Sequence, residues 1–466
     1  MNGYFWTIIE KIFSLLLAII SIIVLPRYLS ASDFGVVAIV TIYINICNTL
    51  VDSGFGGALI QKKKVDDIDY NTVYIFNIIS SIILYIIIFF SSDYIAEFYK
   101  SGKLSLAIKV ASLSLLLSSL YLIHIVKFTR ELNFKIQTKI NLLARSLSLI
   151  LSIAMAINGF SYWSLIIPQI CSHLIILTIC KYNCNYFFKF EFSLEALKKM
   201  AIFGSSLVGA SLVKVGNNSL LAVIIGKFWG VNIIGYYSQA NRFNELYMTN
   251  VISILDKVSF PHLVKVEKIE LKSYVSKLFF NVCYLVFPLI CIIIINSKEV
   301  ILILLGNEWL GSVIYLKFLA VSGFCLIVET IGRNIIKARG FGKELLFGEL
   351  IKLMLAIPVL LICSQFSIEI LLIGYIILTV VNMAINIFII LYKIKISLST
   401  QLVPVLKVLF LSLSSLLLTI YIAKMLDNYN MFLLLGMKTI GYCVIYIGIS
   451  YFCKIDILMN LLKYRK

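Results

Sequence analysis

Charged residues are scarce in this 466-residue sequence: Asp, Glu, Lys and Arg make up 14% of it, against about 25% in soluble domains. Hydrophobic residues make up 61% and the mean hydropathy is +1.00, which excludes an ordinary cytosolic enzyme. With six prolines and no hydrophilic tether, the chain is not disordered. Its ten cysteines fall mostly within apolar runs, which excludes a secreted disulfide scaffold. The composition predicts a polytopic membrane protein.

Motifs for nucleotides and metals are also missing. The sequence has no G-x-x-x-x-G-K-[ST] loop, and its three histidines, His124, His173 and His262, are too scattered for a metal site. The acidic run Asp66–Asp69 resembles a glycosyltransferase metal cluster, but we interpret it as a solvated loop that caps the third helix. The outer connections are too short for a catalytic domain. We therefore expect no cofactor, no metal and no enzymatic activity.

Long apolar runs that do not alternate, such as Tyr74–Phe90 and Val408–Ala423, indicate spanning helices, because a spanning strand needs only about ten alternating residues. The fold class we expect is an all-α polytopic membrane protein. The segment near 5–29 lacks a basic n-region and a cleavage site, so we expect it to be retained as the first helix. We predict fourteen spans, near residues 5–29, 34–60, 73–96, 104–126, 138–157, 161–180, 200–225, 236–256, 278–296, 311–336, 344–363, 368–392, 403–423 and 431–453.

The distribution of basic residues predicts the orientation. With the N-terminus inside, the cytoplasmic segments hold 24 of the 41 Lys and Arg residues and the outer connections hold six. This positive-inside bias places both termini in the cytoplasm. The net charge of +18 then reflects topology and attraction to anionic lipids, and nucleic acid is not needed as a partner.

Eleven basic residues remain inside predicted spans, against five acids: Glu10, Asp52, Glu245, Glu329 and Glu349. Because a charge at mid-bilayer costs at least about 2.5–3.5 kcal/mol, such residues face a watery cavity or a partner. The excess of cations favours a cavity for an anionic solute. The candidates for binding it are Arg145, Lys214, Arg242, Arg333, Lys109, Lys317 and Lys11.

Internal pairing is the alternative explanation for these charges. Glu329 and Arg333 are one turn apart and suited to pair, as are Glu349 and Lys352. Lys139, Lys352 and Lys407 lie near the cytoplasmic ends of their spans, from which a lysine can extend to the interface. Lys214, in contrast, lies near the middle of the seventh span.

An internal repeat relates the two halves. An offset of 200 residues aligns Arg27-Tyr28-Leu29 with Lys227-Phe228-Trp229, and Phe34-Gly35 with Ile234-Gly235. A second match, at offset 208, aligns Lys109 with Lys317. Six helices separate the copies, and an even number preserves orientation, so we predict parallel repeats with a binding site at their interface.

A set of ordered motifs resembles bacterial polysaccharide flippases. These are the Wzx-like exporters of lipid-linked oligosaccharides, in the multidrug/oligosaccharidyl-lipid/polysaccharide exporter superfamily. The motifs run in family order over residues 5–345 and the last four helices match by hydropathy alone. They are Arg27–Leu29 with Asp33–Gly35, Leu50–Gln61 followed by Lys62–Lys64, Ile225–Gly230 with Gly235–Ala240, Phe260-Pro261, Leu305–Trp309 and Ala338–Lys343.

This resemblance implies two pseudo-symmetric six-helix lobes around a central cavity, followed by two further helices. The lobes would be residues 1–190 and 191–395, and residues 396–466 would hold the last two helices and a basic tail. The protein would lie in the bacterial cytoplasmic membrane and move an undecaprenyl-diphosphate-linked glycan by alternating access, driven by an ion gradient or the membrane potential. Polysaccharide polymerase and chain-length proteins would be further partners in O-antigen, capsule or exopolysaccharide assembly.

In that reading, Arg145, Lys214, Arg242 and Arg333 would receive the diphosphate or acidic sugars. Asp52 matches the acidic position at the end of the family's second helix and would take part in ion coupling. The sequence departs from the family at Asn217–Leu221, where relatives often carry charged or polar residues, so ion-coupling residues of the seventh helix do not carry over.

Two other functions compete with this one. A multidrug exporter of the same superfamily should have an acidic cavity if it takes cations, and the charges here are net basic. A membrane polysaccharide polymerase would be an enzyme and would need a large outer loop with basic residues, which this sequence lacks.

Overall fold

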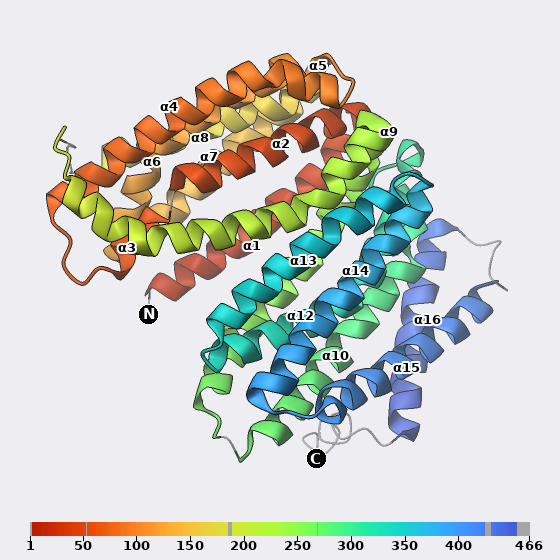
Figure 1. The fold of residues 1–466 in the computed structure, drawn as a ribbon. Coiled ribbons are helices and arrows are strands. Elements are labelled where there is room, and N and C mark those ends of the chain that lie inside the picture. Colours follow the sequence, from red (N-terminus) through yellow and green to blue (C-terminus); the bar gives the residue numbers. More distant parts are fainter. Residues whose placement is uncertain (1, 53, 185–188, 268, 425–429, 454–466) are drawn as a thin grey trace. The chain divides into compact units, whose positions relative to one another are not determined.

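The computed structural model describes residues 2–52, 54–184, 189–267, 269–424 and 430–453, and within them the chain is helical without strands (Figure 1). The first half contains α1 (Asn2–Val24), η1 (Leu25–Arg27), α2 (Ala31–Asp52), α3 (Phe55–Gln61), α4 (Asp67–Phe98), α5 (Lys103–Ala111), α6 (Leu113–Arg130), α7 (Phe134–Ile157), α8 (Trp163–Asn183) and α9 (Leu194–Lys265). The second half contains α10 (Leu271–Ile295), α11 (Ser297–Leu304), η2 (Asn307–Trp309), α12 (Ser312–Ala338), α13 (Gly342–Cys363), α14 (Ile368–Ile389), η3 (Ile390–Ile394), α15 (Leu398–Ala423) and α16 (Met431–Phe452).

Thirteen helical segments of the described chain are long and apolar enough to cross a membrane. The segment Ser211–Lys265 has 55 residues and covers two predicted spans, those near 200–225 and 236–256. It is interrupted at Gly230, whose φ of 84° and ψ of 178° are not helical. The predicted all-α membrane fold is therefore confirmed, and each of the fourteen predicted spans has a counterpart.

The predicted second span, 34–60, is too long. Gly54 takes the left-handed conformation, with φ at 66°, which a residue without Cβ adopts at little cost. Helix α2 therefore ends at Asp52, and a separate short helix, α3, begins at Phe55. The hydropathy of this stretch is continuous, so it does not reveal the break.

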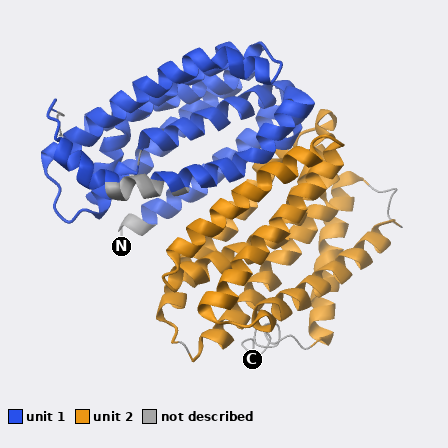
Figure 2. Cartoon of the chain, viewed as in Figure 1, with its two compact units in different colours: residues 1–238 blue, residues 239–466 orange. Residues whose placement is uncertain are grey.

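The described chain divides into two compact units, residues 1–238 and 239–466 (Figure 2). In the first unit α7 packs on both α1 and α8, and α6 packs on α4 and α8. In the second, α10 packs on α12 and α15, and α12 packs on α14. The sequence-based lobes at 1–190 and 191–395 stay a prediction.

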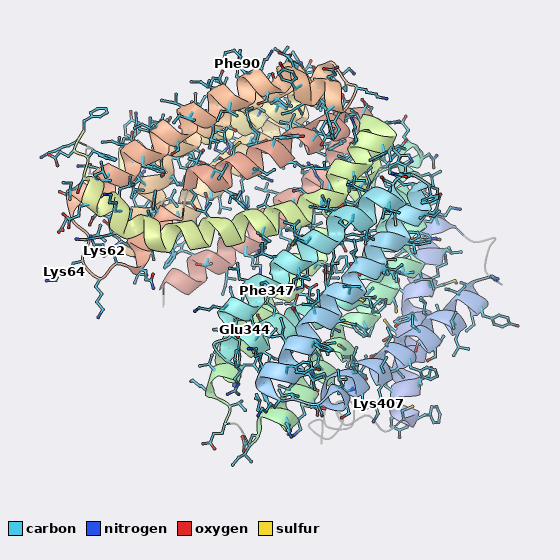
Figure 3. All side chains as sticks on the ribbon, in the orientation of Figure 1. Lys62, Lys64, Phe90, Glu344, Phe347 and Lys407 are labelled. Atoms are coloured by element: carbon cyan, nitrogen blue, oxygen red, sulfur yellow. The ribbon has the colours of Figure 1, made fainter. Side chains whose placement is uncertain are left out.

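Apolar side chains cover both the interior and the surface of these helices. Phe279 and Ile290 of α10 are buried in the core of the second unit. Phe90 of α4 and Phe347 of α13 are exposed (Figure 3). Large apolar groups on the surface are what a lipid solvent favours.

The acidic run Asp66–Asp69 forms the N-terminal cap of α4. Asp66 and Asp69 make a capping box, in which each side chain accepts a hydrogen bond from the other's backbone N–H. Lys62 pairs with Asp69 at 2.6 Å. The interpretation of this run as a helix cap is confirmed, and each carboxylate of the box satisfies a backbone donor that the helix itself leaves unpaired.

Two glycines allow α2 and the part of α9 that follows Gly230 to cross at backbone contact. A Cβ atom on Gly35 would lie 1.8 Å from the carbonyl oxygen of Val231. A Cβ atom on Gly235 would lie 1.8 Å from the carbonyl oxygen of Ala31. Both glycines and both facing residues are related by the offset of 200 found in the sequence, so the repeat has a symmetric structural role here.

Candidate functional site

A cleft of about 330 Å³ opens among α1, α7 and α8 in the first unit. Its lining combines one cation, Arg145, with side chains that can form hydrogen bonds and with apolar side chains that are mostly leucines. The polar lining residues other than Arg145 are Ser14, Ser21, Ser148, Ser152, Gln169 and Ser172. The cleft therefore offers a charged donor and several neutral donors and acceptors at membrane depth.

Arg145 lies well inside α7. It is eleven residues beyond Phe134, the first residue of α7, which corresponds to about 16 Å along the helix axis. Its side chain is exposed, so the guanidinium is accessible from the cleft. A guanidinium presents a planar set of five N–H donors that matches phosphate or carboxylate oxygens.

Pro168 shapes the wall that α8 gives to the cleft. A proline inside a helix has no N–H, so the carbonyl of Ser164, four residues earlier, loses its helical partner. The hydroxyl of Ser152 on α7 donates to that carbonyl oxygen at 2.6 Å. One turn earlier on α7, the Ser148 hydroxyl donates to the carbonyl oxygen of Pro168 at 2.9 Å.

On the opposite wall, α1 is fastened to α7 through Glu10. Its carboxylate accepts hydrogen bonds from Asn141 Nδ2 at 2.7 Å and from Thr138 Oγ1 at 3.2 Å. These two hydrogen bonds satisfy both carboxylate oxygens of an acid that lies in the first span. One turn after Glu10 on α1, the buried hydroxyl oxygen of Ser14 has no hydrogen-bond partner among the described residues.

Five polar residues of α7 form a stripe that the charge of Arg145 alone does not reveal. Its members are spaced alternately three and four residues apart, which places them on a single helix face: Thr138, Asn141, Arg145, Ser148 and Ser152. We singled out Arg145 by its charge alone. The spacing of three and four residues between the neutral members and Arg145 is the sequence signal that predicts the complete polar stripe.

The other sequence-predicted cations lie outside this cleft's lining. Lys109 of α5 pairs with Asp93 of α4 at 2.9 Å, and Lys214 on α9 and Lys11 on α1 are exposed. In the second unit, Lys317 is exposed and Arg333 is half-buried, with Arg333 Nη2 donating to Thr330 Oγ1 at 3.2 Å. Arg242, on α9 in the second unit, is also half-buried.

Lys352 departs from its predicted behaviour. We expected it to extend toward the interface, but it is buried, with Nζ 2.7 Å from Glu329 Oε1 and 2.8 Å from Glu349 Oε1. The predicted pairing with Glu349 is present. Glu329 pairs with Lys352 of the neighbouring helix instead of with Arg333 of its own, because the packing of α12 against α13 brings Lys352 within reach.

Asp52 is the last residue of α2 and is exposed. Its Oδ1 would lie 3.1 Å from a Cβ atom on Gly56, so this glycine leaves room for the carboxylate at the turn into α3. Asp52 therefore lies at the end of the second helix, as the resemblance implies, and not inside a helix that continues to residue 60.

Comparison with known proteins identifies a matching family and several distant relatives. A family model described as "Polysaccharide biosynthesis protein" matches residues 24–314. The chain is 23% identical over 417 residues to the teichuronic acid biosynthesis protein TuaB of Bacillus subtilis (strain 168), covering 87% of this chain and 85% of that protein. It is 22% identical over 400 residues to the lipopolysaccharide biosynthesis protein WzxC of Escherichia coli (strain K12), covering 84% and 80% respectively.

Solved structures share the fold. The lipid II flippase MurJ in an inward closed conformation matches with a TM-score of 0.76 at 15% identity, covering 98% of this chain and all of that one. An inward-facing multidrug resistance transporter of the MATE family, in the MOP superfamily, matches with a TM-score of 0.58 at 16% identity, covering 81% and 92%. At these identities the likeness shows a common helical architecture.

Proposed function

Because this chain belongs to the polysaccharide biosynthesis protein family, as the match over residues 24–314 shows, we propose that it is a flippase for undecaprenyl-diphosphate-linked oligosaccharide repeat units. The resemblance to Wzx-like proteins is confirmed by the curated relatives. To this resemblance we add three proposals: the lipid carrier, the direction of transport from the cytoplasmic to the outer leaflet, and the energy source.

The observation that carries this proposal is the cleft around Arg145. A diphosphate needs cationic and multidentate hydrogen-bond donors, and Arg145 is the cation in the lining of this cleft. Sugar hydroxyls need neutral groups that both donate and accept, which the surrounding serines and Gln169 provide. A drug cation would instead be repelled by the guanidinium.

The remaining cations would also take part in transport. We propose that Lys214, Arg242 and Arg333 bind anionic groups of the substrate, and that Lys11, Lys109 and Lys317 assist at other stages of the transport path. Asp52, exposed at the end of α2, would contribute to ion coupling. The membrane potential supplies about 2.3 kcal/mol per elementary charge per 100 mV, enough to bias a transport cycle.

Alternating access also needs a contact that opens and closes. The crossing of α2 and α9 at Gly35 and Gly235 lies near Arg27 and Lys227, on the side that the basic residues predict to be outer. We propose that this crossing closes the outer entrance in the inward-accessible state. The bacterial cytoplasmic membrane, with both termini in the cytoplasm, is the location consistent with this direction.

The test uses purified protein in liposomes with a labelled undecaprenyl-diphosphate oligosaccharide on one leaflet. We expect protein-dependent appearance of the label on the other leaflet. Movement of drug cations without movement of the glycan lipid would identify a multidrug exporter. Growth of the glycan chain would identify a polymerase, and either result would contradict the proposal.

A further inference from the structure

A buried charge cluster connects α12 and α13 in the second unit, whereas the cleft around Arg145 belongs to the first unit. The Lys352 ammonium bridges Glu329 of α12 and Glu349 of α13 at 2.7 and 2.8 Å. The side chains of Lys352 and Glu329 are 2% and 9% exposed, whereas that of Glu349 is 26% exposed. Both helices are membrane-spanning candidates, so this cluster lies where water is scarce.

The cluster holds one ammonium and two carboxylates, and therefore one more negative than positive charge when all three are ionised. An uncompensated charge is costly at this depth. One turn along α12, the Arg333 side chain hydrogen-bonds to Thr330, and it forms no ion pair with either glutamate among the described side chains. A further positive charge bound at the cluster would remove the imbalance.

The other titratable groups around the cluster are weakly acidic tyrosines and cysteines and one further ion pair. Tyr375 of α14 and Cys325 of α12 interact electrostatically with Glu329. Cys283 and Tyr284 of α10, which packs on α12, lie in the surrounding core. On η3, which also contacts α12, Lys393 pairs with Glu344 at 3.3 Å.

Asn386 of α14 holds a buried hydrogen-bond acceptor against the turn of α12 that carries Glu329. Its Nδ2 donates to the backbone carbonyl of Glu329 at 3.2 Å, which fixes it against the same turn of α12. Its Oδ1 is buried and has no hydrogen-bond partner among the described residues. Because an unpaired buried acceptor is destabilising, this oxygen favours a hydrogen-bond donor close to the turn of α12 that carries Glu329.

The geometry also selects the kind of cation. Lys352 Nζ already occupies the position between the two carboxylate oxygens, where a metal ion would have to bind. A proton needs no such space, since it attaches to one carboxylate oxygen. Glu349 is the more accessible of the two acids and is therefore the one that a proton reaches.

We propose that Glu329, Lys352 and Glu349 form a proton-binding site, and that Glu349 takes up the proton as its carboxylate becomes a carboxylic acid. The resulting cluster is neutral overall, with Lys352 paired chiefly to Glu329. Protonation thereby changes how α13 is held against α12. The assignment of this site to the energy coupling of transport rests on the proposed function, whereas proton binding itself does not.

Infrared difference spectroscopy of the full protein in lipid membranes tests proton binding directly. As the pH is lowered, the wild type should gain a carbonyl band of a buried carboxylic acid, and Glu349→Gln should lose that component. The matched control is Glu195→Gln, which changes an exposed glutamate that pairs with Lys199 on the surface. An identical band in Glu349→Gln and the wild type would overturn the proposal.

Folding and ion identity are checked in the same samples. Glutamine keeps an oxygen that accepts from Lys352, so Glu349→Gln should unfold within a few degrees of the wild type. The conservative change Glu349→Asp should restore a band at a shifted frequency. Loss of the acid band when sodium is added at constant pH would show that a metal ion competes for the site and would overturn the assignment to a proton.

The link to transport is tested with imposed gradients in liposomes. A pH gradient should change the rate of glycan-lipid crossing by the wild type, and the rate of Glu349→Gln should be independent of that gradient. A wild-type rate that follows a sodium gradient alone would contradict proton coupling. If the wild type moves no glycan lipid, the proposed function fails while the infrared result still decides the proton site.

Discussion

Gly35 and Gly235 have the same role in the crossing of α2 and α9: each removes a side chain at the point where the other helix places a backbone carbonyl. The clearance that a Cβ atom would have is 1.8 Å on both sides, far below an allowed contact. The residues that supply the carbonyls, Val231 and Ala31, are also 200 positions apart. A weak sequence repeat is thus visible as a two-fold contact.

Alanine at either glycine should open this crossing. Because a Cβ atom cannot be accommodated against a backbone carbonyl, Gly35→Ala and Gly235→Ala should each destabilise the folded protein by about 1–3 kcal/mol. The measurement is thermal unfolding in detergent. Gly441→Ala, in α16 with nothing within 4 Å of the added atom, is the control and should be neutral or stabilising by up to about 1 kcal/mol. Equal effects at all three positions would contradict the packing argument.

Arg145 should dominate recognition of the anionic head group. Removal of a charged hydrogen-bond donor costs about 1.5–3 kcal/mol, so Arg145→Ala should weaken binding of undecaprenyl diphosphate by about 10- to 100-fold. Arg145→Lys keeps the charge without the planar donor array, so its affinity should lie between those of the wild type and Arg145→Ala. Equilibrium binding to protein in nanodiscs measures this. Lys407→Ala, which removes an exposed cation of α15, should leave the affinity unchanged.

Ser152 should stabilise the proline-containing wall of the cleft. Ser152→Ala leaves the carbonyl of Ser164 without the donor that replaces the missing N–H of Pro168 and should cost about 1–3 kcal/mol. Chemical or thermal unfolding detects this loss. Ser146→Ala, on the same helix but outside the cleft lining, serves as the control. A loss as large for Ser146→Ala would show that the Ser164 carbonyl is not the cause.

Substitution of Lys352 should lower the folding stability of the second unit strongly. Lys352→Met leaves the carboxylates of Glu329 and Glu349 without their shared partner and should destabilise by about 3–5 kcal/mol. Lys407→Met is the matched control on an exposed site. The double variant Lys352→Met with Glu329→Gln should regain part of the loss, because it removes one of the stranded charges. No recovery would contradict an electrostatic origin.

Helix positions were predictable because lipid-spanning helices must be long and apolar whatever their neighbours. The break after Asp52 was not, because Gly54 stops the helix through backbone conformation while the hydropathy stays high. The 3-4 stripe on α7 was present in the sequence but hidden among ordinary serines. Only the packing against α8 distinguishes Ser152, which compensates Pro168, from Ser146.

The partner of a buried charge is harder to predict than its presence. Glu329 has Arg333 one turn away on its own helix, yet it pairs with Lys352 across the interface of α12 and α13. Local spacing identifies contacts within a helix. It carries no information on which face a neighbouring helix presents. It therefore predicts the pair of Glu349 with Lys352 within α13 but not the pair of Glu329 with Lys352 between α12 and α13.

Wild type and Arg145→Ala should be compared in the same liposomes, with labelled undecaprenyl-diphosphate oligosaccharide on one leaflet. We expect the label to cross to the other leaflet with the wild type, and the initial rate at low substrate to fall about 10- to 100-fold with Arg145→Ala. A wild type that moves no label would contradict the proposed flippase function. Equal rates in the two proteins would contradict the role of the Arg145 cleft in recognising the substrate.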